Sequence, residues 1–85
     1  MGETGILKRE IAIYVLRAHG VGVIAQQDSL PDMLVLAKGD VLEARRLPEY
    51  LGRQLIHYLA RKFDIPIHHF YHPELFLAPP ETPLQ

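Results

Sequence analysis

Apolar residues recur at helical spacing near the start of the chain. Between positions 4 and 18 one stripe repeats at steps of three and four residues, formed by Leu7, Ile11, Tyr14, Val15 and Ala18. This spacing predicts a helix over 4–18, with Thr4 as N-cap and His19-Gly20 as its end. Three further apolar residues lie off the stripe: Ile6, Ile13 and Leu16. We expect this second apolar face to form the contact of a homodimer.

The middle of the chain has the composition of β-strands. Segments 21–26 and 41–47 alternate loosely between apolar and polar residues, and segment 32–38 is almost entirely apolar. Asp28-Ser29-Leu30-Pro31 separates the first pair, and Lys38-Gly39-Asp40 is short enough for a hairpin loop. These features predict a three-stranded antiparallel meander with 32–38 at its centre.

A second helix is predicted from Pro48 to Phe63. Proline suits the first helical position, and the expected buried stripe is Leu51, Leu55, Tyr58 and Leu59. Asp64-Ile65-Pro66 ends the helix, and 67–71 is expected to be a short fourth strand. The prediction is an α/β domain of the α+β type over 1–71, followed by a Pro-rich tail over 72–85.

The composition of the chain bears on its domain size, on disulfides and on its expected location in the cell. The chain has 85 residues, of which 48% are apolar and 22% charged, so one small domain with a limited core is expected. A homodimer would enlarge that core. Cysteine is absent, which excludes disulfides and thiolate metal sites. No apolar run approaches the roughly 20 residues of a membrane span, and no secretory signal is apparent. We expect a cytoplasmic protein without membrane contact.

Positive charge is concentrated in one segment. Residues 44–62 carry five basic side chains against Glu49 alone, whereas the net charge of the whole chain is −1. Such a segment suits phosphates, but near-neutrality is unlike a dedicated nucleic-acid binder. A solvated helix face is the alternative explanation.

Five residues have the order and spacing of a nuclease site. Pro31-Asp32 precedes the hairpin signal, Glu43-Ala44-Arg45 follows it, and Glu10 and Gln54 lie in the two predicted helices. Over about residues 6–71 the chain resembles the small Holliday-junction resolvases and related VRR-type nucleases of the PD-(D/E)xK superfamily. That resemblance implies a restriction-endonuclease-like core and DNA as the partner.

The resemblance also implies a role for each residue. Asp32 and Glu43 would hold Mg²⁺, which prefers carboxylate oxygens, and the ion would polarise the phosphate and activate water. Glu43 and Arg45 are two apart in a strand, so they should share a face. Glu10 would add a ligand and Gln54 would orient the water. The expected catalytic set is Asp32, Glu43, Arg45, Glu10 and Gln54.

Arg45 departs from the family, which has lysine at this position. A guanidinium stays charged and is a poor base, so the exchange is not conservative. Three interpretations follow: a slower nuclease, a nucleic-acid-binding relative that does not cut, or a non-catalytic interaction or homodimerisation module. Double-stranded-RNA-binding domains share the element order, but Pro48-Glu49-Tyr50-Leu51 lacks the lysine-rich helix start that they use.

Histidines form a competing candidate site. His68, His69 and His72 lie close together in sequence, with Glu74 two positions further on. Zinc favours imidazole ligands, but a stable site needs three or four protein ligands. Adjacent histidines in a strand would point to opposite faces, so the alternative is a polar rim with no metal.

Overall fold

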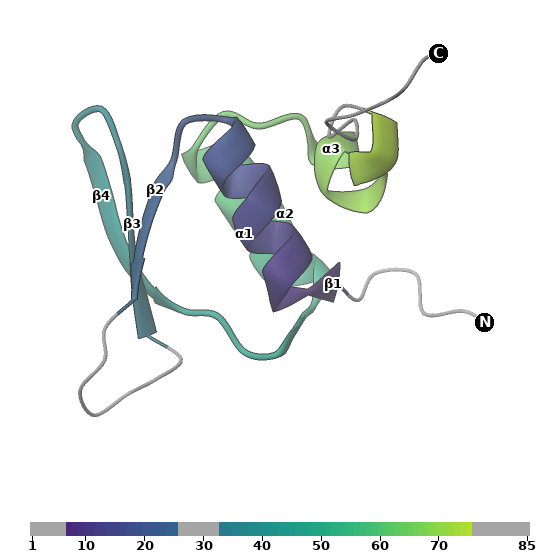
Figure 1. The fold of residues 1–85 in the computed structure, drawn as a ribbon, viewed down its shortest axis with the longest axis horizontal. Helices are drawn as coiled ribbons and strands as arrows, with labels where there is room; N and C mark the ends of the chain where they lie inside the picture. Colours follow the sequence, from purple (N-terminus) through teal and green to yellow (C-terminus); the bar gives the residue numbers. More distant parts are fainter. Residues whose placement is uncertain (1–6, 26–32, 76–85) are drawn as a thin grey trace, which may run out of the picture.

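The computed structural model describes residues 7–25 and 33–75 of the chain (Figure 1). Their secondary structure follows the chain in the order β1 (Leu7–Lys8), α1 (Arg9–Ala18), β2 (Gly22–Ala25), β3 (Met33–Lys38), β4 (Val41–Arg46), β5 (Tyr50–Leu51), α2 (Arg53–Lys62), α3 (Ile67–Tyr71) and the 3-10 helix η1 (Pro73–Leu75). The predicted mixed α+β class is confirmed.

The main sheet is the expected antiparallel meander, with strand order β2-β3-β4. In the strand register, Val35 on the central strand pairs with Ile24 of β2 on one side and with Ala44 of β4 on the other. Lys38 pairs with Val41 across the hairpin, where Gly39 has φ +59, a conformation that glycine adopts without steric cost. The hairpin predicted from Lys38-Gly39-Asp40 is therefore present.

Both long helices lie on the same side of this sheet (Figure 1). On β3, Leu34 and Leu36 alternate with less buried neighbours, so they form the face turned toward the helices. The largest fully buried side chains come from α1, β3, β5, α2, α3 and the segments between elements: Val15, Leu16, Val21, Leu36, Leu47, Leu51, Ile56, Leu59, Phe63 and Phe70.

A second, two-stranded sheet shortens both predicted helices. Leu7 pairs with Leu51 and Lys8 with Tyr50, and the backbone N–H of Arg9 donates to the Glu49 carbonyl at 2.9 Å. Residues 7–8 and 50–51 are therefore strands, so α1 begins at Arg9 and α2 at Arg53, whereas the sequence predicted helix from positions 4 and 48. Long-range pairing here prevails over local helix signals, and Thr4 lies outside the described residues.

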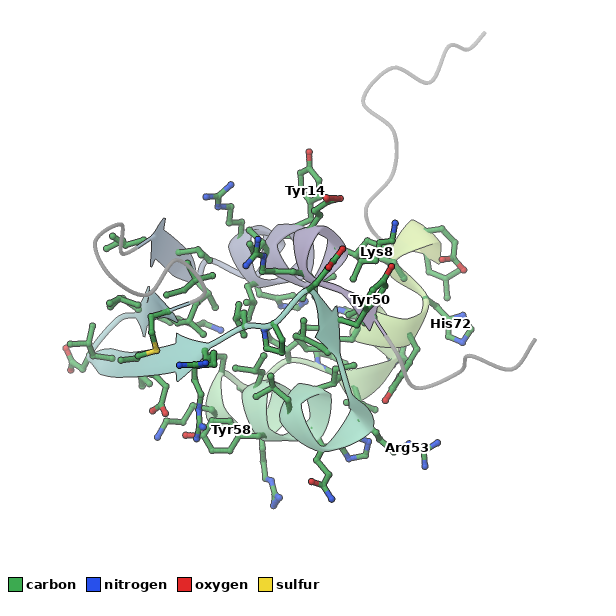
Figure 2. The ribbon with its side chains drawn as sticks, turned by 90° about the horizontal axis from the view of Figure 1, so that it is seen from below. Lys8, Tyr14, Tyr50, Arg53, Tyr58 and His72 are labelled. Carbon is green, nitrogen blue, oxygen red and sulfur yellow. The ribbon has the colours of Figure 1, made fainter. Side chains whose placement is uncertain are left out.

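Helix α1 turns a different face to the core from the one predicted. Its buried residues are Ala12, Val15 and Leu16, whereas Tyr14 of the predicted stripe is 64% exposed. Figure 2 shows Tyr14 pointing away from the body of the domain. Leu16 of the predicted dimer face is fully buried within the domain and Ile13 packs against the core, so these two residues do not form the exposed apolar patch that the sequence predicted. Ile6 lies outside the described residues.

The predicted fourth strand is a helix. Residues 67–71 form α3 directly after Pro66. Two residues before Pro66, Asp64 has φ +57, which turns the chain between α2 and α3. A strand would place Ile67 and Phe70 on opposite faces, whereas the helix brings them together, with Phe70 fully buried. The sheet therefore ends at three strands in the described residues. Residues 72–75, which the sequence assigned to the tail, include η1.

Candidate functional site

Strand β4 directs two of the predicted site residues toward the helices. Glu43 lies opposite Leu36 and Arg45 opposite Leu34 in the strand register, so both stand on the face that carries the buried leucines. The Nε atom of Arg45 lies 3.3 Å from Oε2 of Glu43. The structure thus places these two side chains on one face, as their spacing predicted.

Helix α2 supplies two partners that the sequence did not reveal. Tyr58 donates a hydrogen bond from its hydroxyl to Glu43 Oε2 at 2.7 Å, and Lys62 Nζ lies 3.4 Å from Oε1. Tyr58 and Lys62 are four residues apart, so both project from one side of the helix. Figure 2 shows Tyr58 on the side of α2 next to the sheet. Only the packing of α2 on β4 brings them to Glu43.

Arg45 also contacts the aromatic ring of Tyr58. Its guanidinium carbon lies 4.3 Å from the centre of the Tyr58 ring, which is a cation–π contact. Its Nε is buried without an aligned hydrogen bond in the described residues, so the contact with Glu43 is mainly electrostatic. We name Glu43, Arg45, Tyr58 and Lys62 the Glu43 cluster.

The electrostatics of the Glu43 cluster keep its carboxylate ionised. The Tyr58 hydrogen bond is the main cause that lowers the pKa of Glu43 below its ordinary value of 4.5, and the charges of Lys62 and Arg45 act in the same direction. Partial burial opposes the shift but does not reverse it. Each carboxylate oxygen of Glu43 therefore has a partner from α2, the Tyr58 hydroxyl at Oε2 and the Lys62 ammonium at Oε1.

Replacing Glu43 by glutamine is expected to remove a pH-dependent part of the stability. The folded carboxylate has the lower pKa, so its contribution is present above about pH 4.5 and is lost as the pH falls through the folded value. Urea unfolding between about pH 3 and 7 measures the effect. The stability curves of wild type and Glu43→Gln should converge in acid, and the exposed Glu10→Gln is the control for a glutamate-to-glutamine exchange outside the Glu43 cluster. Parallel curves for Glu43→Gln would contradict this assignment.

The remaining predicted residues do not join the Glu43 cluster in the described part of the chain. Glu10 lies in the first turn of α1 and lines a shallow surface hollow with Lys8, Arg9 and Glu49, beside β1 and β5. Gln54 is exposed in the first turn of α2. Asp32 lies outside the described residues. The Asp32–Glu43 magnesium site therefore stays a prediction.

The histidines are grouped differently from the sequence expectation. His69 Nδ1 lies 2.8 Å from Nε2 of His19, which caps the end of α1 fifty residues earlier in the chain. The ring of His68 stands edge-on to that of His69 at 4.6 Å. His72 instead approaches Glu74 at 3.6 Å on the surface. Within residues 7–25 and 33–75, no three histidine or acidic side chains converge to hold a metal ion.

Comparison with known proteins does not assign this site. No protein family, curated protein or solved structure matches the chain. In the part of the chain that the structure describes, none of the helices is long and apolar enough to cross a membrane.

Proposed function

We propose that this domain is a protein-interaction module that self-associates through the outer face of its main sheet. The observation that carries the proposal is the exposure of two large aliphatic side chains there, Leu42 at 68% and Ile24 at 59%. We define the outer sheet face as the side of β2, β3 and β4 turned away from α1 and α2. Its apolar residues are Ile24, Met33, Val35, Ala37, Leu42 and Ala44.

The strand register makes these residues contiguous. Ile24, Val35 and Ala44 form one row across the three strands, and Ala37 and Leu42 pair in the next. Arg46 also stands on the outer sheet face, at the corner where it pairs with Met33, and it is charged. An antiparallel sheet with one covered face usually exposes polar side chains on the other, so an apolar outer face is typical of an interface.

A second copy of the chain fits this face better than a charged partner. The centre of the face carries no charge, so it offers no complementarity to an acidic or basic surface. Another copy presents the same flat, apolar sheet, and two sheets pack well when their strands are nearly aligned. In a two-fold dimer Arg46 would lie at the rim, where water can solvate it.

The size of the face predicts a weak dimer. Three strands about 4.8 Å apart, with six residues at about 3.4 Å each along β3, cover on the order of 300 Å². Two such faces with interleaved side chains would bury on the order of 600–1,000 Å², below the roughly 1,200–2,000 Å² of stable specific interfaces. Reversible association, with a Kd in the micromolar range or weaker, is the expected behaviour.

Sedimentation velocity at concentrations from micromolar to millimolar tests the proposal. Wild type should shift from monomer to dimer over this range, and Leu42→Lys or Ile24→Lys should raise the Kd at least about tenfold, which corresponds to about 1.4 kcal/mol. Tyr14→Lys is the matched control, because Tyr14 is equally exposed but lies on α1. A wild-type monomer at every concentration, or an equal effect of Tyr14→Lys, would reject the outer sheet face as the interface.

The nuclease interpretation stays a prediction of the resemblance. One observation favours it: Lys62 brings an ammonium group to Glu43, the chemical group that Arg45 fails to supply. Both oxygens of Glu43 are engaged, however, and Asp32 lies outside the described residues. The observed contacts and exposed side chains therefore support the interaction module more than they support the nuclease.

A further inference from the structure

Two imidazole rings from distant parts of the chain meet between α1 and α3. Nε2 of His19 and Nδ1 of His69 lie 2.8 Å apart, and the ring centres are 5.0 Å apart. One nitrogen must carry a proton and the other must present its lone pair, since two lone pairs would repel. Both rings are half-buried, so they are reachable from water but are not fully solvated.

Rigid elements hold the two rings in place. His19 follows Val15 and Leu16, both fully buried, and its backbone N–H donates to their carbonyl groups at 3.2 and 3.0 Å. His69 precedes the fully buried Phe70. The backbone positions of both histidines are therefore set by the core, which lowers the entropy cost of bringing two ligands to one ion.

The distance between the ring centres suits coordination of a single metal ion. With metal–nitrogen bonds of about 2.1 Å, two imidazoles whose centres lie 5.0 Å apart subtend an angle of about 100° at the ion. The nitrogens would then separate to about 3.2 Å, which requires the rings to tilt while their centres stay in place. Rotation about χ2 of histidine is soft, so this tilt is accessible.

We propose that His19 and His69 form a two-histidine site for a divalent transition-metal ion, with Cu²⁺ bound most tightly. The ion takes the place of the proton shared by the two nitrogens, and that proton moves to the other ring nitrogen of the same imidazole, so that both rings stay neutral. Imidazole suits Cu²⁺, Ni²⁺ and Zn²⁺, and a site with given nitrogen ligands generally binds Cu²⁺ more tightly than Ni²⁺ or Zn²⁺. Water completes the coordination, and the bound ion joins the end of α1 to α3.

Neighbouring charges set the strength of this site. Burial is the main cause that lowers the pKa of His19, and the neighbouring His69 and the Lys38 ammonium act in the same direction. The same ammonium, held by a 3.0 Å hydrogen bond to the Phe63 carbonyl, opposes a bound cation. With two protein ligands and this repulsion, we expect micromolar rather than tighter binding.

Thermal unfolding near pH 7.5 with CuCl₂, NiCl₂, ZnCl₂ or MgCl₂ tests the site. At about 100 times its Kd, CuCl₂ should raise Tm by about 10–20 °C, with smaller shifts for NiCl₂ and ZnCl₂ and none for MgCl₂. His19→Ala and His69→Ala should each abolish the shift caused by CuCl₂. The exposed His57→Ala and His72→Ala are matched controls and should retain it.

A second measurement on the wild-type chain does not depend on how the variants fold. Substoichiometric Cu²⁺ should broaden the amide resonances around His19 and His69 first in two-dimensional NMR, and the Cu²⁺ electron paramagnetic resonance spectrum should show two equatorial nitrogens. Broadening centred on His57, His72 or the chain terminus would overturn the proposal. An equal loss of the thermal shift in His57→Ala would overturn it as well.

Discussion

Replacing Phe70 by alanine is expected to lower the free energy of unfolding by about 3–5 kcal/mol, a large share of the stability of a small domain. Phe70 is fully buried although it lies near the C-terminal end of the described residues. Removing its ring leaves a cavity that α3 cannot refill, because the neighbouring residues of this short helix are already packed or exposed. Urea unfolding at neutral pH measures the loss.

Leu75→Ala is the control for this prediction. Leu75 lies five residues further on in η1 and is 69% exposed, so its truncation should change stability by less than about 0.5 kcal/mol. A small effect of Phe70→Ala would mean that α3 is an appendage rather than part of the core. The difference between the two variants therefore tests how the segment after Pro66 folds.

Leucine-to-alanine substitutions on opposite faces of the main sheet should have very different effects. Leu36 on β3 is fully buried toward the helices, and its truncation should cost about 2–5 kcal/mol. Leu42 on β4 carries the same side chain on the outer sheet face, where it is mostly exposed. In dilute protein, where self-association is absent, Leu42→Ala should cost less than about 0.5 kcal/mol.

The same pair also separates folding from association. At high protein concentration Leu42→Ala should weaken the proposed dimer, whereas Leu36→Ala should act chiefly through unfolding of each copy. Urea unfolding at two protein concentrations, combined with sedimentation, distinguishes the two effects. Comparable losses for both variants in dilute protein would show that the outer sheet face is covered within one copy, and the interaction proposal would then fail.

Glu43 and Arg45 belong both to the predicted catalytic set and to the Glu43 cluster. A glutamate and an arginine two apart on a strand satisfy the spacing of a metal-binding motif, and they satisfy equally well the spacing of an ion pair within β4. The other partners of Glu43 lie outside β4. Tyr58 and Lys62 come from α2, so their contacts depend on how the helix packs rather than on any local spacing.

Local patterns were sufficient for the main sheet. A turn needs a residue that tolerates positive φ, and Gly39 is that residue, so the hairpin between β3 and β4 is readable from the sequence. Strand alternation has a period of two, so the shared face of Glu43 and Arg45 follows from their spacing alone. The mixed α+β class follows from the succession of helical and strand periodicities.

Tertiary structure alone determined the helix ends, the face of α1 and the nature of residues 67–71. The pairing of Leu7 with Leu51 joins segments more than forty residues apart and converts two predicted helical ends into strands. Helix α1 buries Ala12, whose small side chain allows the helix to pack closely against its neighbours. The predicted stripe was built from larger apolar residues and therefore did not include Ala12. Hydrophobic periodicity describes only neighbours along the chain, whereas these outcomes, like the meeting of His19 with His69, depend on contacts between distant segments.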